Sequence, residues 1–455
     1  MPKRPRQPND SLAQLLAEAG MSSAELARSV NRLAAAQGVV LRYDRTSVAH
    51  WLAGSRPRAF VAQLVAEVFT RGTRRLIGVA ETGLTQGSDT ADPTGEPVSQ
   101  VPLHDLVALA RTDAEPVRRS GLQSYVFRER GLPDIHVART AASVSRSGSG
   151  AKAGAADVDR IRFVVDQFYA NWSRFGGAHA RGALASYLGD DVARLLAQPT
   201  PRNIRPALIS ATAQLAHILG GMSADAGFQG LAQRYYFLAL STASEAGDRR
   251  TRAITLRAMS VQAVRMHAPR YADDLADAAV TTVGRSKDGN LRAFVLAQRA
   301  YVRSFSGERR APCRDLRAAE QVRGQTSSGE GPFHRYPAAG LAYRTGQTLY
   351  RLGLTRPALD ALRSAADHRL GHEHRLRAQS QARLALVLLD QGHVDEACVH
   401  GRLFVSEYPA LRSHRSSLLL QELQARLTQF QRLPEAADLV RTLLALNVPW
   451  VPAQR

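Results

Sequence analysis

Apolar residues recur at helical spacing along almost the whole chain, and no strand-like alternation interrupts them. Near the N-terminus, segment 11–20 places leucines on one face and ends at Gly20. Segment 22–38 opens with Ser22 followed by Glu25 three residues later, the pattern of a capping box. A longer amphipathic helix is expected just after Pro57. The pattern predicts an all-α protein that begins with a compact bundle of short helices.

Residues 45–52 form the most informative of these predicted helices. Asp44 is placed to cap its start and Gly54 to stop it, while Val48, Trp51 and Leu52 form an apolar face for the core. The opposite face carries short polar and basic side chains, the kind that bond to base edges and phosphates in a DNA groove. The predicted DNA contacts lie on this face and beside both ends of the helix: Arg42, Arg45, Thr46, Ser47, His50, Arg56 and Arg58. A solvated helix of a small bundle is the competing interpretation.

The C-terminal two thirds of the chain carry a repeat. Gly353 and Ala358 are matched by Gly392 and Ala397, and Ala436 follows at the same 39-residue step. Two helices joined by a short turn, repeated at this period, indicate stacked helical hairpins. One hairpin cannot bury its apolar stripe alone, so the copies are expected to stack into an α-solenoid with a concave face.

Composition shifts divide the chain into four parts. Residues 1–84 are expected to form the DNA-binding domain, and 157–449 the repeat domain. Between them, 85–156 is predicted to be a linker rich in Pro, Gly and Ser with short helical pieces, and 450–455 a tail. The apolar residues of 122–135 are expected either to dock on the next domain or to form a small hairpin.

The formal net charge of +20 favours a polyanionic partner, although a solvated basic surface accounts for it equally well. Only three of the 60 basic residues are lysines, a bias attributed here to a GC-rich genome. The two cysteines are too few for a disulfide framework or a thiolate zinc site. The N-terminus lacks the apolar core of a secretory signal, and no apolar run is long enough to span a membrane. A cytoplasmic, nucleoid-associated protein is expected.

No catalytic motif, cofactor fingerprint or metal-ligand set is recognised, so we expect neither an enzyme nor a bound cofactor or metal. His368, His372 and His374 have metal-compatible spacing, but Gly371 interrupts the helix and favours a solvated loop. In the repeat region, the most site-like group is Arg234, Tyr235 and Tyr236, where a peptide or protein ligand could bind in the groove. Packing between repeats explains these aromatic residues equally well.

Three stretches resemble a known family: RYDRTSVAHWLAGSRPR (42–58), FGGAHAR (175–181) and GLAQRYYFLAL (230–240). They are similar to actinobacterial regulators in which an XRE-type, lambda-repressor-like helix-turn-helix precedes tetratricopeptide-like repeats. The resemblance implies control of development or antibiotic production, and DNA contacts by Arg45, Thr46, Ser47 and His50. One departure is a longer connector before residues 45–52 than the turn usual in that class.

The sequence therefore predicts a sequence-specific transcription regulator that binds double-stranded DNA as a homodimer, with repeats that receive a signal, a partner or a second subunit. The alternative is a tetratricopeptide-type adaptor whose N-terminal helices bind protein and not DNA.

Overall fold

The structure is a computed structural model that describes residues 7–73, 75, 77–84, 102–123, 125–129, 152–325 and 331–446. All secondary structure in these ranges is helical, which confirms the all-α prediction. None of the described helices is long and apolar enough to cross a membrane.

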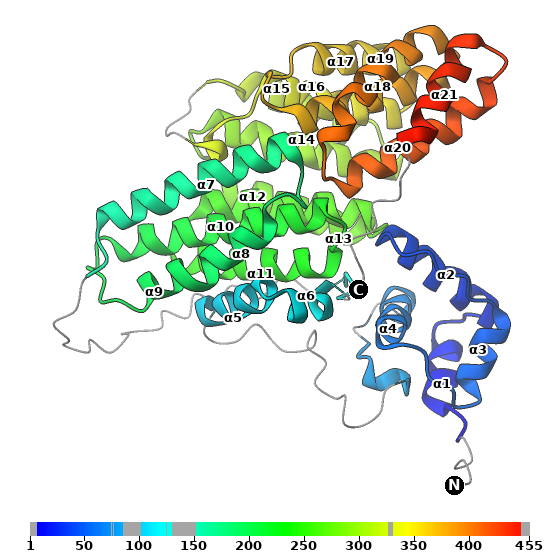
Figure 1. The fold of residues 1–455 in the computed structure, drawn as a ribbon, viewed down its shortest axis with the longest axis horizontal. Coiled ribbons are helices and arrows are strands. Elements are labelled where there is room, and N and C mark those ends of the chain that lie inside the picture. The colour runs from blue at the N-terminus through cyan, green and yellow to red at the C-terminus, as the bar shows by residue number, and fades with distance from the viewer. Residues whose placement is uncertain are drawn as a thin grey trace.

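Residues 7–84 form an N-terminal lobe, drawn in blue at the edge of the molecule in Figure 1. Its helices are α1 (Asp10–Glu18), α2 (Ser23–Ala36), α3 (Arg45–Leu52), α4 (Ala59–Thr73) and the short turn η1 (Ala80–Thr82). The predicted cap at Ser22 is present with its reciprocal bonds to Glu25. Val48 and Trp51 are buried with Leu12, Leu26 and Phe69 in one core, as the apolar face of residues 45–52 predicted.

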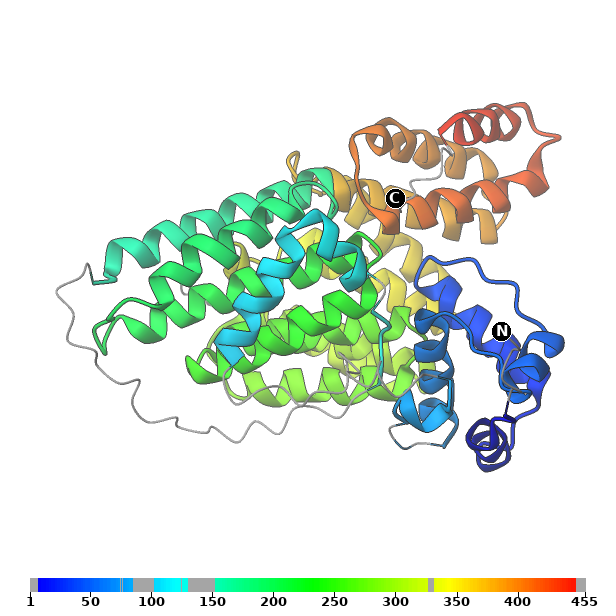
Figure 2. The ribbon, with the colours of Figure 1, turned by 60° about the horizontal axis from the view of Figure 1, so that its bottom comes forward.

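A stack of helical hairpins, here the hairpin array, makes up most of the remaining structure (Figures 1 and 2). In each pair, two consecutive helices pack against one another. The pairs are α10 (Arg205–Asp225) with α11 (Gln229–Glu245), α12 (Arg249–Arg265) with α13 (Pro269–Val283), α14 (Gly289–Arg303) with α15 (Arg310–Val322), α16 (Ala338–Arg351) with α17 (Thr355–Asp367), α18 (His374–Asp390) with α19 (Val394–Glu407), and α20 (His414–Leu427) with α21 (Pro434–Leu446).

The glycines of the sequence repeat have identifiable positions in these hairpins. Gly353 and Gly392 end the first helices of their pairs with φ of +73° and +78°, a conformation that favours glycine. Gly346 of α16 lies close to α17, and a Cβ there would stand 2.6 Å from Leu362 Cγ. Gln431, at the third matching position, has φ of −60° and needs no glycine.

Hydrogen bonds between successive first helices also recur at a fixed step. His217 Nδ1 lies 3.0 Å from Thr255 Oγ1, and Gln298 Nε2 donates to Ser260 Oγ over 3.2 Å; each pair is 38 residues apart. These buried polar contacts fix the register between neighbouring pairs because an unpaired polar group there would lose its hydration.

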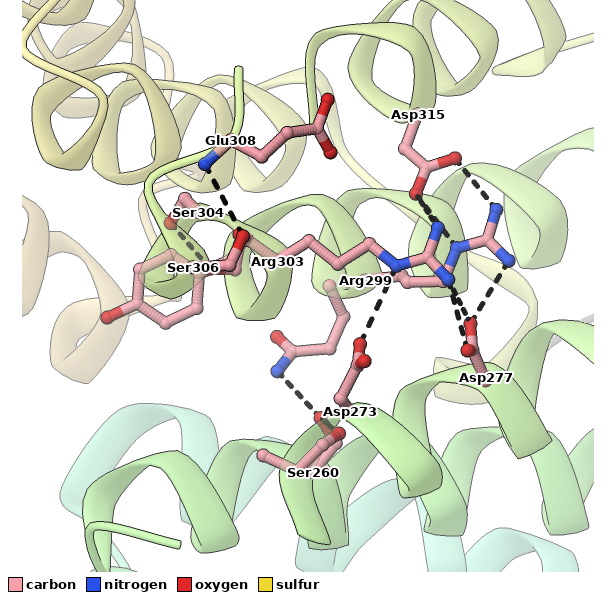
Figure 3. Close-up of polar contacts among 12 residues, drawn as sticks. Ser260, Asp273, Asp277, Arg299, Arg303, Ser304, Ser306, Glu308 and Asp315 are labelled. Atoms are coloured by element: carbon pink, nitrogen blue, oxygen red, sulfur yellow. Dashed lines mark hydrogen bonds and ion pairs between the residues drawn. The ribbon is translucent and has the colours of Figure 1, made fainter. Parts of the chain in front are cut away.

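Further polar contacts hold the outer helices of the array (Figure 3). Arg299 on α14 makes a two-pronged contact with Asp315 on α15, with distances of 2.8 and 2.7 Å. Arg303, one turn later, donates to Asp277 on α13 over 2.8 Å. Every arginine drawn in Figure 3 therefore faces at least one carboxylate from another helix.

Helix α7 (Ala155–Phe175) packs on both α10 and α18 and so joins early and late pairs of the array. Its C-terminal end continues into the short helices α8 (Arg181–Tyr187) and α9 (Ala193–Leu196), separated by one turn of π-helix. Just after α7, Gly177 N–H donates to Asp225 Oδ2 on α10 over 2.7 Å. A Cβ on Gly177 would come within 2.2 Å of the Met222 carbonyl, so this approach requires glycine.

The short helical pieces expected within the linker 85–156 are present, and they are packed against other helices. Helices α5 (Pro102–Ala114) and α6 (Pro116–Gln123) are packed on the array, and Leu106, Leu109 and Leu122 belong to the core shared with α7 and α10. The hydrophobic residues of α5 form a stripe that is buried against neighbouring helices. The linker-like composition of the flanking sequence gave no sign of this packing. Helix α7 begins at Ala155, and residues 85–101 and 130–151 lie outside the described part.

The segment 125–129 connects the N-terminal lobe to the array, in line with the predicted docking of 122–135. Val126 N–H donates to Gln63 of α4 over 3.2 Å, and Arg128 N–H donates to Gln233 of α11 over 3.0 Å. Val126 belongs to the core of the lobe, whereas Phe127 belongs to the core of the array. The backbone of this short segment thus forms hydrogen bonds with side chains of both the lobe and the array.

Glu67 of α4 lies beside this segment and is almost fully buried. Its carboxylate accepts from Arg71 Nε over 2.7 Å and from Glu129 N–H over 3.3 Å. Burial is the larger effect and raises the pKa of Glu67 from 4.5 to about 7. Arg71 in turn donates to the Met266 carbonyl of the array over 2.8 Å.

The contact between lobe and array should depend on the size of residue 230. Alanine normally stabilises a helix interior by about 1 kcal/mol relative to glycine. At Gly230, however, a Cβ would lie 2.2 Å from the Tyr125 carbonyl. We therefore expect Gly230→Ala to destabilise the protein by about 1–3 kcal/mol and to speed tryptic cleavage after Arg128. Gly72→Ala, whose Cβ would meet Ala19 at an ordinary 3.4 Å, is the matched control and should not destabilise. Equal thermal stability of both variants would contradict this packing.

Stability should also depend on the protonation of Glu67. A carboxyl whose pKa is raised on folding stabilises the fold below pH 4.5 and loses that contribution as pH rises towards about 7. Glu67→Gln should therefore gain about 2 kcal/mol of unfolding free energy relative to wild type between about pH 5 and about pH 8, measured by urea unfolding. Glu25→Gln, at an exposed cap, should show no such gain. A pH-independent difference between Glu67→Gln and wild type would rule out the raised pKa.

Candidate nucleic-acid interface

Helix α3 begins and ends where the sequence predicts. Asp44 caps it, because Ser47 N–H donates to the Asp44 carboxylate over 2.8 Å. Ser47 Oγ also donates to Asp44 over 2.8 Å, and it is half-buried. The Asp44 pKa is lowered by these hydrogen bonds from Ser47. Ser47 therefore uses its hydroxyl within the cap, whereas it was predicted to contact DNA.

The long connector between α2 and α3 is held by a residue that sequence reasoning missed. Asn31 of α2 donates to the Tyr43 carbonyl over 2.8 Å and accepts from Tyr43 N–H over 3.0 Å. The Tyr43 ring then meets Trp51 edge-on, with centroids 5.1 Å apart. An asparagine in the middle of a helix was the available signal, because such a side chain often bonds to neighbouring backbone. The connector thus positions α3 in spite of its length.

The other predicted DNA contacts are all solvent-exposed: Arg42, Arg45, Thr46, His50, Arg56 and Arg58. Arg45 and Thr46 lie in the first turn of α3 and His50 one turn later. Arg42 precedes the helix, and Arg56 and Arg58 follow it. The structure thus brings six of the seven predicted side chains to a free surface on and beside one helix.

The arginines around α3 differ from Arg71 and Arg75 by their lack of partners, a property that Arg28 and Arg32 of α2 share within the described part of the lobe. Within the ranges that the structure describes, the side chains of Arg42, Arg45, Arg56 and Arg58 form no salt bridge or hydrogen bond. Arg75, by contrast, bridges Glu18 and Glu81 at 2.8 Å each. Four unneutralised guanidinium groups around α3 make a cationic surface with donors for phosphate and base edges.

The second predicted site does not form as one group. Tyr235 is fully buried and donates to Asp113 of α5 over 2.8 Å, so no ligand can reach it in this structure. Arg234 lies over the Tyr125 ring at 4.4 Å. Only Tyr236 lines a cavity of the array, and it is itself buried. Adjacent residues on a helix point in different directions, and α5 covers the side that holds Tyr235.

The histidines near residue 370 have other partners. His374 Nδ1 lies 2.7 Å from Glu407, and His368 Nδ1 lies 2.9 Å from the Ser364 carbonyl. No group of His, Cys, Asp or Glu in the described ranges is arranged to hold a metal ion.

Sequence reasoning also missed a cavity inside the array that is rich in arginine. Its side chains come from helices that are far apart in the chain, among them Trp172 of α7 and Arg375 of α18, which are 203 residues apart. Arg257 and Arg265 lie eight residues apart on α12 and share a face, which was the one local signal.

Comparison with known proteins gives one match, on the N-terminal lobe. Residues 12–85 are similar to the family described as the SP15 N-terminal domain. The matched range begins in α1 and ends just after η1, so it coincides with the lobe that carries α3. A comparison with curated proteins finds no match.

Proposed function

We propose that the chain is a sequence-specific DNA-binding transcription regulator. In this proposal the N-terminal lobe is a lambda-repressor-like helix-turn-helix unit, with α2 and α3 as its two helices. The hairpin array is a tetratricopeptide-like solenoid. The observation that supports DNA binding is the gathering of four exposed arginines without partners among the described residues on and beside α3.

The positions of the side chains suggest different roles. Arg45 lies at the start of α3, where a guanidinium fork could reach guanine O6 and N7 when the helix enters the major groove. Thr46 and His50 lie on the same exposed side. Arg42, Arg56 and Arg58 are outside the helix and suit phosphate contacts. Ser47 maintains the cap at the start of the helix.

A homodimer and a peptide or protein ligand for the array remain part of this proposal. Two half-sites would increase affinity for a palindromic operator. The fixed contacts between lobe and array, through Arg71 and segment 125–129, would hold α3 in a constant orientation relative to the array.

Replacement of Arg45 tests the reading role of α3. We expect Arg45→Ala in the full chain to weaken binding to a selected duplex by about 1–3 kcal/mol and to relax one base position. Fluorescence anisotropy with the duplex and its single-base variants measures both effects. If affinity and base preference were the same as in wild type, α3 would not be the reading helix.

Arg56→Ala is expected to act differently, because a phosphate contact carries no base preference. It should weaken binding equally for all duplexes and reduce the slope of log affinity against log salt by about 1. Arg75→Ala, which removes a paired arginine of the same lobe, is the control and should leave the slope unchanged. Absence of duplex binding by the wild-type chain at low salt would favour the adaptor function instead.

A further inference from the structure

The hairpin array encloses a cavity of about 250 Å³. Its walls come from the first helices of all six pairs and from α7, and the segment 332–337 covers one side. The cavity is lined mainly by residues of these first helices.

Positive charge dominates this cavity. Seven arginines but only two carboxylates line it. The arginines that matter most come from four different helices and the turn before α18: Arg257, Arg265, Arg344, Arg369, Arg375 and Arg415.

Both carboxylates are already engaged with the protein. Asp225 accepts from Gly177 N–H and from Ser413 Oγ over 2.9 Å, and lies 3.6 Å from Arg375. Glu373 lies 3.7 Å from Arg369. Among the described residues, Arg257, Arg265, Arg344 and Arg415 form no ion pair. The cavity therefore holds several positive charges that the protein itself does not neutralise.

Burial makes this arrangement unfavourable for the empty protein. Arg344 is only 7% exposed, and its Nε has no hydrogen-bond partner, like Nε of Arg257. Desolvation, followed by repulsion from Arg344 and Arg415, lowers the pKa of Arg257 to about 9. The pKa of Tyr343 is lowered although burial alone would raise it, because four surrounding arginines favour its anion. The arginines that surround Arg257 and Tyr343 thus contribute to both pKa shifts, and the protein supplies too few negative charges to offset them.

The chain pairs buried arginines elsewhere, so this field is a local feature. Arg299, in the same array, faces Asp315 and Asp277, and these carboxylates raise its pKa despite burial (Figure 3). Arg344 on α16, by contrast, has only Gln347 as a hydrogen-bond acceptor among the described residues, at 3.0 Å. An anion from outside the chain would supply the missing acceptors.

Aromatic rings hold the guanidinium groups in fixed orientations. Arg257 lies 4.0 Å from the Phe294 ring centroid, and Arg375 lies 4.8 Å from that of Trp172. The Phe333 ring also borders the cavity. Trp172 Nε1 and Tyr336 OH are buried without a partner among the described residues, so both can donate to a ligand. His217 adds no charge, because burial lowers its pKa to about 3.

We propose that this cavity binds a small phosphorylated organic anion with a flat ring, of the nucleotide class. Guanidinium forks from several directions match the oxygens of a phosphate chain, and the aromatic walls match a planar ring. The cavity volume of about 250 Å³ suits a small compound and excludes a nucleic-acid duplex. This proposal does not depend on DNA binding by α3.

Calorimetry and thermal shift on the full chain, without DNA, test the proposal. The probes are inorganic phosphate, pyrophosphate, ATP and citrate. We expect pyrophosphate and ATP to bind and raise Tm, with ATP the tighter because its ring is also held, and phosphate to be weaker than both. No binding by any probe would overturn the proposal. Citrate binding as tightly as pyrophosphate would overturn the assignment to phosphorylated compounds.

Variants of two cavity arginines locate the site. Arg257→Gln and Arg344→Gln should each weaken ATP binding about tenfold or more, and each should raise Tm of the empty protein because a buried, unpaired charge is removed. Arg257→Lys should bind with intermediate affinity. Arg317→Gln, an exposed position on α15, is the matched control and should bind as wild type. Equal losses in Arg317→Gln and Arg257→Gln would show adventitious surface binding and overturn the proposal.

Discussion

The buried carboxylate of Asp225 is the interaction on which the arrangement of this molecule most depends. It accepts hydrogen bonds from Gly177 after α7 and from Ser413 before α20, so one side chain joins the first and last hairpin pairs. The residues after Ser413 extend this junction in two directions. His414 packs against Gly38 at the end of α2, where a Cβ would lie 2.8 Å from its Nε2, and Arg415 lines the cavity. Three consecutive residues thus contact different parts of the molecule: Ser413 bonds to Asp225, His414 packs on the N-terminal lobe, and Arg415 lines the cavity.

Arginines in this chain fall into two groups with different consequences. Some face carboxylates of neighbouring helices, as Arg299 and Arg303 of α14 do (Figure 3), and they help to fix one helix against the next. Among the described residues, the arginines around α3 lack such partners, and so do four arginines of the cavity: Arg257, Arg265, Arg344 and Arg415. An exposed unpaired arginine costs little because water solvates it, whereas a buried one such as Arg344 costs much more. The two sets of unpaired arginines are thus suited to different anions. The set around α3 suits a large anion at the surface, and the set in the cavity suits a small anion.

The sequence predicted what depends on local pattern. The all-α class, the cap at Asp44, the core position of Trp51 and the glycine turns of the hairpins follow from helical periodicity and turn chemistry. The roles of α5, of Tyr235 and of the cavity arginines could not be predicted, because they depend on which helices meet in space. Tyr235 is adjacent to Arg234 in sequence, yet it is covered by a helix more than 100 residues away (|i−j| of 122 to Asp113). The arginine content of the chain was attributed to genome composition, and only the fold shows that some of these side chains converge.

Selection of bound sequences from a random pool of DNA duplexes by the full chain tests the central claim most directly. A regulator whose α3 reads base edges should enrich one short sequence over successive rounds at moderate salt. Electrostatic attraction alone would retain duplexes without regard to sequence, and a protein adaptor would retain none above background. Enrichment of a single motif is the predicted result. A bound pool with the same composition as the input would contradict the account.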